Sequence, residues 1–492
     1  MLNHNTPHRP YKSHRTYKTH PQTMKTSLSL SISLSLVAAA AAAVGPDYKR
    51  PEVAAPVAWN AATSPEILPR GDWWMLYGDS ELDVLVTRAL QANQDLVAAA
   101  ARVEQARAAA GIARSAYFPS AAVGASADRS RTSRTTDVVM PLAQTETIRG
   151  ALDASWELDL FGRVRRLNES ARAGALASAA DFESVQLALT AEVAANYFSL
   201  RALDREIALV DEGVALRRRA LELVTSRRSG GAATDFDVAR AESELASTQA
   251  ESSALANRRA ALQNALAVLL GEVASDFAIS DLKFEISNPP AVPAGLPAQL
   301  LERRPDIFAA EQTLVAANAQ IGVAKAAFFP AISLTGSAGY ASGEIDRLFR
   351  ADSRAWSIGP SIYLPIFQGG RNRANLERSR AAWEESVARY RQRVLVAFRE
   401  VQDALTATQL LASQAEAQDR AVVAARRAGD LAQTRYDAGY VNYFEVIDAQ
   451  RTLLASERAA TQLGAQRLLT SVALIKSLGG GWTNPAAIAS AN

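Results

Sequence analysis

The sequence carries one series of motifs twice, and this repetition restricts the possible folds more than any other feature. The segment "ARSAYFPSAAVGAS" at 113–126 returns as "AKAAFFPAISLTGS" at 324–337, and "GAATDFDVARAESEL" at 231–245 returns as "GYVNYFEVIDAQRTL" at 439–453. Each half follows the same predicted order: a helix, a strand, a loop, a second strand, a very long helix, a glycine turn and a returning helix. We therefore expect two internal repeats of one structural plan.

The longest helices are predicted over residues 163–228 and 371–436, which contain no proline. At 1.5 Å per residue each is a rod of roughly 100 Å, too long for one compact domain. Apolar residues recur at alternating spacings of three and four, which predicts coiled-coil packing. These seam residues are Leu203, Ile207, Val210, Val214, Leu221 and Val224 in the first half and Val387, Val394, Phe398, Val401 and Leu405 in the second. Arg217 stands where the first seam calls for an apolar residue.

Glycines follow both long helices, in "RRSGGAATDFD" and "YDAGYVNYFE". Gly230 or Gly231 in the first half and Gly439 in the second suit the left-handed residue that ends many helices. The segments Thr234 to Asp237 and Asn442 to Glu445 resemble capping boxes that start the returning helices. We therefore predict two helical hairpins, whose returning helices run to about Leu270 and Leu478.

Four segments alternate apolar and polar residues as half-buried strands do. They cover about 120–131, 148–160, 331–341 and 355–366, and 148–160 alternates most regularly. Their length suits strands that cross a membrane at a tilt. A soluble sandwich would alternate in the same way, but a predicted export signal and a charged strand face favour the membrane.

Four strands cannot close around a lumen, and open strand edges in lipid leave backbone groups unpaired. Three chains would supply the twelve strands of a homotrimeric β-barrel. In that arrangement Asp153, Glu157 and Asp159 face the water-filled lumen, whereas Leu152, Trp156 and Leu158 face lipid. Trp156 and Trp356 would then be interfacial anchors. The fold class is thus mixed and mainly α, with the barrel continued by a long α-helical coiled coil.

Residues 1–44 are predicted to be a leader and signal peptide. The part from Met24 has a Met-Lys start, a short apolar run and small residues, with cleavage expected near Ala41 or Ala43. Because Met24 begins this pattern, the residues before it are an over-extended start or a leader. A buried helix is the alternative, although no amphipathic segment surrounds it.

The composition excludes several classes of function. The chain has no cysteine, and its histidines are His4, His8, His14 and His20, all in the leader. The formal net charge is +2, and basic residues are frequent in the leader, so no basic surface for nucleic acid is predicted. Disulfides, thiol nucleophiles, histidine bases and common zinc ligands are absent after the leader. We expect no cofactor, no metal and no enzymatic activity.

Several motifs together resemble one family. They are "VGPDYKRPEV" at 44–53, "DWWMLYGDSELDVLVTRALQANQDL" at 72–96, "ELDLFGRVRR" at 157–166, "LLERRPDIFAAEQTLVAANAQIGVAKAAFFPAISLTGS" at 300–337 and "IYLPIFQGGRNRA" at 362–374. In this order they resemble the outer membrane factors, the TolC-like and NodT-type channel-tunnels of tripartite multidrug efflux systems. The resemblance implies a trimer in the outer membrane, a helical tunnel through the periplasm, a periplasmic adaptor (membrane fusion) protein and an inner membrane pump of the RND type.

The resemblance and the repeats together predict the organisation of the chain. The first repeat covers 45–285, the linker between repeats 286–299, the second repeat 300–480 and a C-terminal tail 481–492. The expected function is a passive exit duct for drugs or other toxic small molecules. Members with the "GPDY" segment usually have a lipidated cysteine shortly before it, but here that stretch is "AAAAAAV". No lipid anchor is therefore possible as written: either the chain is not lipidated, or the sequence was altered there.

The family closes its periplasmic end with inward-turned hairpin tips, and this implies roles for residues near the glycine turns. Glu445 and Asp448 match the acidic lining of the constriction, and Asp237 and Tyr436 match a link between neighbouring tips. Val441 stands where the family often has a basic residue. The tips, at Gly230, Gly231, Gly439 and Asn442, are the implied adaptor contact. Asp237 and Glu445 have a local alternative, since both could cap their own helices.

Three other functions are weighed against the efflux duct. The outer membrane component of a type I protein secretion system belongs to the same family, but the "GPDY" and "RRPD" motifs favour efflux. A coiled-coil scaffold without a pore predicts an elongated soluble protein, whereas a duct predicts a trimer that needs detergent. An enzyme is the weakest alternative, because the sequence shows no phosphate loop or nucleophile elbow.

Overall fold

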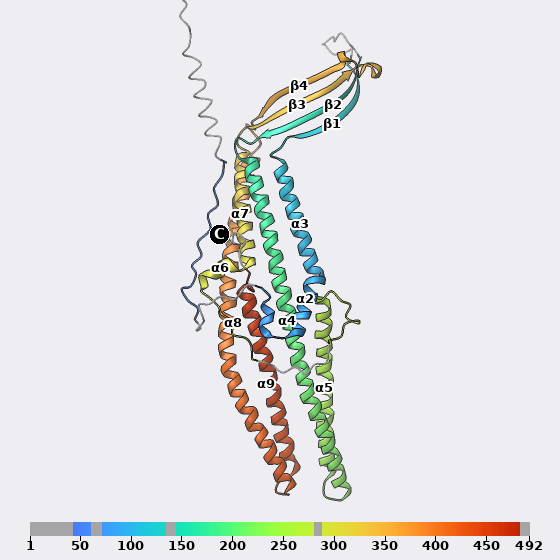
Figure 1. Ribbon diagram of the computed structural model, residues 1–492, viewed down its shortest axis with the longest axis vertical. Helices are drawn as coiled ribbons and strands as arrows, with labels where there is room; N and C mark the ends of the chain where they lie inside the picture. Colours follow the sequence, from blue (N-terminus) through green and yellow to red (C-terminus); the bar gives the residue numbers. More distant parts are fainter. Residues whose placement is uncertain (1–42, 61–70, 134–143, 280–287, 483–492) are drawn as a thin grey trace, which may run out of the picture.

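The computed structural model describes residues 43–60, 71–133, 144–279 and 288–482. The molecule is elongated, with a four-stranded sheet at one end and two helical hairpin tips at the other (Figure 1). The signal peptide and the expected cleavage at Ala41, all four histidines and the tail beyond residue 482 lie outside the described residues. No helix within the described ranges has a stretch both long and apolar enough to cross a membrane.

The helices and strands follow each other in two similar series. The first is η1 (Trp73–Tyr77), α2 (Ser80–Ala92), α3 (Gln94–Ser115), β1 (Ser120–Arg131), β2 (Gln144–Leu158), α4 (Arg163–Ser229) and α5 (Asp235–Leu269). The second is η2 (Pro297–Gln299), α6 (Leu300–Arg303), α7 (Pro305–Ala326), β3 (Ala331–Ser342), η3 (Ile345–Arg347), η4 (Ala351–Ser353), β4 (Arg354–Tyr363), α8 (Arg371–Asp437) and α9 (Tyr443–Ser477).

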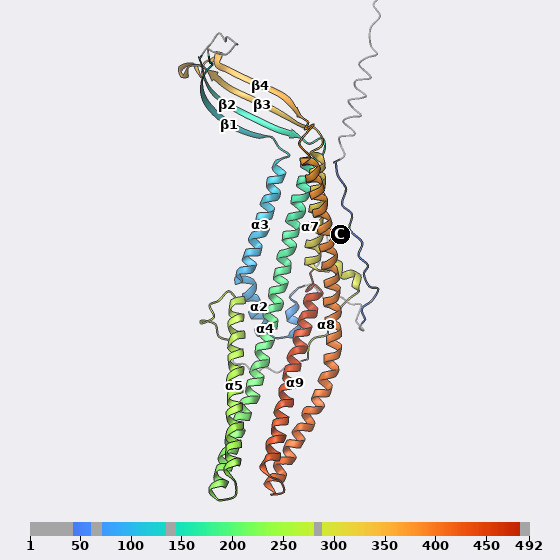
Figure 2. The ribbon, with the colours of Figure 1, turned by 180° about the vertical axis from the view of Figure 1, so that it is seen from behind.

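The two long helices were predicted to within one residue at each end, and α4 and α8 each have 67 residues. Both run the whole length of the helical body (Figures 1 and 2). Near the sheet the helices pack in the order α3, α4, α7, α8, and toward the tips in the order α5, α4, α9, α8. Consequently α3 and α5 form one edge of the helical layer, and α8 forms the other.

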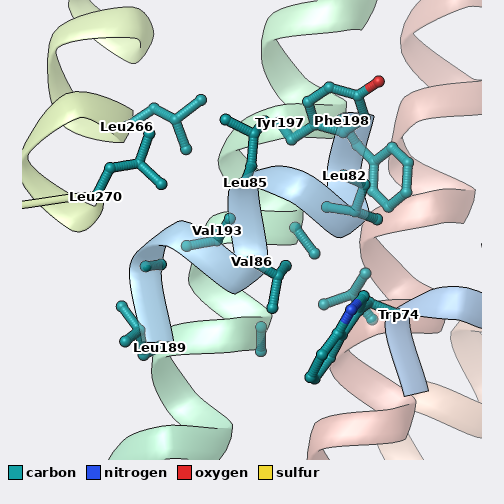
Figure 3. Close-up of a cluster of buried hydrophobic side chains, with 14 of the residues drawn as sticks. Trp74, Leu82, Leu85, Val86, Leu189, Val193, Tyr197, Phe198, Leu266 and Leu270 are labelled. Atoms are coloured by element: carbon teal, nitrogen blue, oxygen red, sulfur yellow. The ribbon is translucent and has the colours of Figure 1, made fainter. Parts of the chain in front are cut away.

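The centre of the body is held by an apolar core. Leu82, Leu85 and Val86 of α2 pack with Trp74 of η1 against α4, next to the end of α5 (Figure 3). Tyr197 belongs to this core and donates a hydrogen bond from its hydroxyl to Asp79 at 2.6 Å. Each fully buried aliphatic side chain contributes about 1.5–3 kcal/mol to the stability of the fold. This apolar core therefore holds η1 and α2 against α4.

The "RRPD" motif fastens α7 to α8 and α9. Arg304 is buried and forms ion pairs with Asp306 at 2.8 Å and Glu400 of α8 at 2.7 Å. It also donates to the backbone carbonyl of Ser477 at 2.9 Å, at the end of α9. A cation near the carbonyl end of a helix is favourable, so this arginine satisfies a helix terminus and joins three helices.

Residues 43–60, named here the N-terminal strap, lie along the outside of α7 and α8 (Figure 2). The Val44 amide donates to the Phe161 carbonyl at 3.0 Å, and Asp47 pairs with the buried Arg166 at 2.7 Å. Arg50 pairs with Glu311 of α7, and the Trp59 indole donates to the Gly295 carbonyl at 3.0 Å. The N-terminal strap, which includes the "GPDY" segment, is thus fixed to the helical body at several points along its length.

The sheet is antiparallel in the order β1-β2-β3-β4. Its register places Trp156 opposite Leu334 and Leu152 opposite Ala338, whereas Asp153 lies opposite Ser337 and Glu157 opposite Ser333. Paired residues share a face, so the sheet has one apolar and one polar face, as the alternation predicted. Among the described residues, β1 pairs only with β2 and β4 only with β3. Both outer edges of the sheet are therefore unpaired within one chain.

The strand predicted over 148–160 differs from β2 at both ends, and one assignment was wrong. The strand ends at Leu158, so Asp159 lies outside it. The carboxylate of Asp159 accepts hydrogen bonds from the backbone amides of Val164 at 3.0 Å and Arg165 at 2.9 Å. Capping the first turn of α4 satisfies donors that a helix leaves free, and this use takes Asp159 out of the strand.

Candidate pore-closing site at the hairpin tips

Both hairpins turn through the same hydrogen-bonded motif. At the end of α4 the Gly231 amide donates to the Arg228 carbonyl at 3.0 Å, and the Ala232 amide donates to the Arg227 carbonyl at 2.8 Å. The Gly439 and Tyr440 amides do the same at the end of α8, to the Tyr436 and Arg435 carbonyls. This is the Schellman motif.

The motif needs a left-handed residue, and Gly231 (φ 77°) and Gly439 (φ 76°) provide it. Gly230 has φ −82° and is therefore not that residue. The sequence had left the choice between Gly230 and Gly231 open, and the backbone angle decides it.

Two segments were expected to be capping boxes, and one of them is. The Asp237 amide donates to the Thr234 hydroxyl at 3.3 Å, and the Thr234 amide donates to the Asp237 carboxylate at 2.8 Å. The carboxylate of Asp237 accepts hydrogen bonds from the Thr234 backbone amide and from the Thr234 hydroxyl, and these two bonds lower its pKa below the usual 3.8. The local capping role of Asp237 is therefore present in the structure.

The second capping box was only half right. Asn442 accepts a hydrogen bond from the Phe444 amide at 3.1 Å and so caps α9. Glu445 points instead to Arg435 of α8, with Oε2 3.7 Å from the guanidinium nitrogen. This long ion pair joins the two helices of one hairpin, and it competes with capping for the same carboxylate.

Glu445 and Asp448 lie one turn apart on α9, and both are exposed. Residues three positions apart in a helix share a face, so their carboxylates lie one above the other. No ion-pair partner of Asp448 occurs in the parts of the chain that the structure describes. Of these two carboxylates next to the turn, Glu445 therefore has a cationic partner in Arg435, whereas Asp448 has none among the described residues.

Asp237 and Tyr436 have different partners within one chain. The Asp237 carboxylate accepts a hydrogen bond from Thr234. Tyr436 is buried between the hairpins, and its hydroxyl has no hydrogen-bond partner among the described residues. The Arg227 guanidinium lies 4.7 Å from the centre of the Tyr436 ring, and the Tyr443 ring lies 5.2 Å away. The side chain is thus held through the faces of its ring.

The sheet residues predicted to line a lumen have different surroundings. Asp153 lies on the polar face and pairs with Arg149 at 2.9 Å, and Arg149 also donates to the Ser337 hydroxyl at 2.7 Å. Glu157 is on the same face and pairs with Arg163 of α4 at 2.6 Å. Polar groups on this face therefore neutralise each other in part.

Sequence reasoning missed the ion pairs that join the hairpins. Glu206 of α4 is buried and pairs at 2.6 Å with Arg458 of α9, which also pairs with Glu251 of α5. Arg451 of α9 pairs with Glu244 of α5 in the same way. The sequence could have indicated these ion pairs, because Arg451 and Arg458 are seven positions apart, as are Glu244 and Glu251. Residues one heptad apart lie on the same face of a helix.

No cluster of histidine, cysteine, aspartate or glutamate side chains that could hold a metal ion occurs in the described ranges. The arrangement at the tips offers carboxylates, guanidinium groups and aromatic rings. Such groups attract or repel charged solutes and hold helices together.

Comparisons with known proteins place the chain in a family. The model described as outer membrane efflux protein matches residues 85–272 and 296–480. The toluene efflux pump outer membrane protein TtgF of Pseudomonas putida is 38% identical over 453 residues, covering 89% of this chain and 94% of the relative. The outer membrane protein OprJ of Pseudomonas aeruginosa is also 38% identical over 453 residues, covering 89% and 93%.

Comparison with solved structures leads to the same family. The outer-membrane channel OprN superposes with a TM-score of 0.83 at 34% identity, covering 89% of this chain and 99% of that one. The chain belongs to the outer membrane efflux protein family and is an outer-membrane efflux channel with a helical periplasmic tunnel.

Proposed function

We propose that three copies of this chain form the outer membrane channel-tunnel of a tripartite efflux system of the RND type. The channel is a passive exit duct for drugs or other toxic small molecules and has no catalytic step. One observation carries the proposal. The sheet has one apolar face and two unpaired edges, and the helical body on which it stands also has two open edges. TtgF, a relative, is named for toluene efflux, which supports small apolar compounds as cargo.

The sheet supports a shared barrel. An unpaired backbone group in lipid costs several kcal/mol, so β4 of one chain is expected to pair with β1 of the next. Three sheets then close as twelve strands with the apolar face toward outer membrane lipid. Asp153 and Glu157 line the lumen, and Asp159 lies at its rim.

The edges of the helical layer support the same closure. The outer side of α5 is exposed and carries mainly small residues, among them Ala239, Ala246 and Ala250. The outer side of α8 is also exposed but carries larger apolar residues, including Leu410, Val423 and Leu431. Small residues against large ones allow helices to interdigitate, so α8 of one chain is expected to pack on α5 of its neighbour.

The hairpin tips close the tunnel in this proposal. Three-fold symmetry brings three copies of Glu445 and Asp448 around the axis, where two carboxylate rings attract cations and repel anions. Asp237 and Tyr436 lie at the contacts between tips. Gly230, Gly231, Gly439 and Asn442 form the ends that meet the periplasmic adaptor, which couples the duct to the inner membrane pump. Protein export by a type I system is the alternative, but the relatives named above favour efflux.

Planar bilayer recording of the purified protein tests the proposal. The native channel is expected to give small cation-selective currents, and Glu445→Ala with Asp448→Ala is expected to remove the selectivity. Glu222→Ala, which removes an exposed carboxylate of α4 outside the α5 and α8 surfaces proposed to meet, is the matched control and should leave the cation selectivity unchanged. A water-soluble monomer without affinity for bilayers would refute the proposed duct. Unchanged selectivity in the double variant would refute only the carboxylate rings.

A further inference from the structure

Two contacts near the turns join one hairpin of the chain to the other. The Arg227 guanidinium of α4 lies 4.7 Å from the centre of the Tyr436 ring of α8. The Arg240 guanidinium of α5 lies 4.2 Å from the centre of the Phe444 ring of α9. Both distances are within the roughly 6 Å over which a cation is attracted to an aromatic face. In both contacts the first hairpin supplies the cation and the second supplies the ring.

The ion pairs next to the turns do not join the two hairpins. Arg228 pairs with Asp235 at 2.6 Å, within the first hairpin, and Arg435 pairs with Glu445 at 3.7 Å, within the second. Each of these ion pairs closes a hairpin on itself. The ion pairs of Arg451 and Arg458 with α5 do cross between the hairpins, but they lie farther from the turns. Next to the turns, therefore, Arg227 and Arg240 of the first hairpin contact the second hairpin through the faces of aromatic rings.

Tyr436 shows that the ring, and not the hydroxyl, makes the contact. The residue is only 7% exposed, and its hydroxyl has no hydrogen-bond partner among the described residues. Burying a hydroxyl without a partner is unfavourable, and the contacts that offset this cost are those of the ring with Arg227 and Tyr443. Phe444 makes the corresponding contact with Arg240 and has no hydroxyl at all.

We propose that Arg227 with Tyr436 and Arg240 with Phe444 form a cation–π latch, which holds the two hairpin tips of one chain together and breaks when they separate. The inference rests on the proposed function, in which the tips close the tunnel.

The absence of cysteine from the sequence makes a direct test possible. Ala232→Cys and Ala438→Cys place one spin label on each exposed tip. Labelled chains are diluted with unlabelled chains, so that most trimers contain one labelled chain, and the distance between the labels is measured by pulsed electron resonance. Phe444→Leu and Tyr436→Leu keep apolar bulk but remove the ring. Each is expected to lengthen and broaden the distance distribution, and the two together more than either alone.

Two controls distinguish the latch from a link through the tyrosine hydroxyl and from a general effect of losing an arginine. Tyr436→Phe keeps the ring and is expected to leave the distance unchanged, whereas a link through the hydroxyl predicts a longer distance. Arg228→Gln removes the neighbouring arginine, whose ion pair among the described residues lies within its own hairpin, and is also expected to leave the distance unchanged. The latch is refuted if Tyr436→Leu and Phe444→Leu leave the distance unchanged in folded protein, or if Arg228→Gln lengthens it equally.

Bilayer recording of the same variants separates the latch from the proposed function. If the tips close the tunnel, removing one latch contact should increase the open fraction roughly threefold to tenfold, as expected for a contact of this kind. Longer tip distances without a change in current would support the latch but refute closure at the tips. A larger current with unchanged tip distances would refute the latch and leave the duct intact.

Discussion

At the scale of single residues, two glycines determine where the N-terminal strap can lie. Gly45 has φ +117°, and a Cβ there would lie 2.5 Å from Cα of Gly322 in α7. A Cβ on Gly322 would lie 2.8 Å from the Val44 carbonyl oxygen and 2.7 Å from Cγ of Arg166. The strap therefore approaches α7 as closely as two backbones can, and side chains at either position would push it away.

Gly322→Ala is expected to loosen the strap. The added methyl group meets backbone and the buried Arg166, and overpacking of this kind costs about 1–3 kcal/mol. Tryptic cleavage at Lys49 should become faster and the melting temperature should fall. Gly174→Ala in α4 is the matched control, because nothing lies within 4 Å of a Cβ there. That change should be neutral or slightly stabilising, since alanine favours helix over glycine. Equal effects of both substitutions would contradict the close approach.

The hairpin caps show how far the sequence determines single residues. The spacing of Thr234 and Asp237 predicted a capping box correctly, because both partners lie within one turn of the same helix. The same pattern at Asn442 and Glu445 failed in part, because Arg435 on the neighbouring helix competes for the carboxylate. Local patterns therefore predict local bonds until a residue distant in sequence offers an ion pair.

At the scale of helices and strands, periodicity predicted most of the fold. The seam positions of α4 and α8 are buried or half-buried, and the alternation of β2 agrees with the faces that its register defines. Arg217 was the exception in the seam, and its guanidinium lies 3.9 Å from Glu244 of α5. Periodicity predicts which side of a helix is covered. It does not predict which polar residues on that side find partners on other helices.

Glu206 is the most suitable residue for measuring how much the ion pairs between hairpins contribute to stability. Its side chain is 6% exposed and accepts hydrogen bonds from Arg458 and from Gln462, the latter at 3.0 Å. Glu206→Ala leaves Arg458 partly buried without its main partner, and breaking a buried pair costs about 3–5 kcal/mol. Thermal unfolding in detergent should show a clearly lower melting temperature.

Glu344→Ala provides the control for this measurement. Glu344 lies 2.9 Å from Arg347 in the segment between β3 and β4, outside the helical layer, and both side chains are well exposed. A surface pair of this kind contributes at most about 0.5 kcal/mol, so little change is expected. A melting temperature that falls equally in both variants would show that the ion pairs between hairpins do not hold them together.

At the scale of the whole molecule, the described part of one chain has four open edges, two on its sheet and two on its helical layer. The sequence predicted the strands and the long helices, but a single sequence gives no register between different chains. The order of strands places β1 and β4 at the outside, and the order of helices places α3, α5 and α8 at the outside. Sheet and helices thus leave the same sides uncovered, which favours a ring of identical chains over a pair.

The two faces of the sheet make a prediction about the whole assembly, because neighbouring residues of β4 lie on opposite faces. Ile358 shares its face with Ala154, whereas Ser357 shares its face with Asp153. If the apolar face meets lipid, Ile358→Arg places a charge in the bilayer at a cost of about 2–4 kcal/mol near its middle. The proposed trimer, expected to resist heat, should then largely disappear from the outer membrane fraction. Ser357→Arg instead adds a charge to the lumen, so the trimer should persist and the reversal potential should shift toward anion selectivity. The opposite result, with Ser357→Arg blocking assembly and Ile358→Arg tolerated, would mean that the polar face is not the one around the pore.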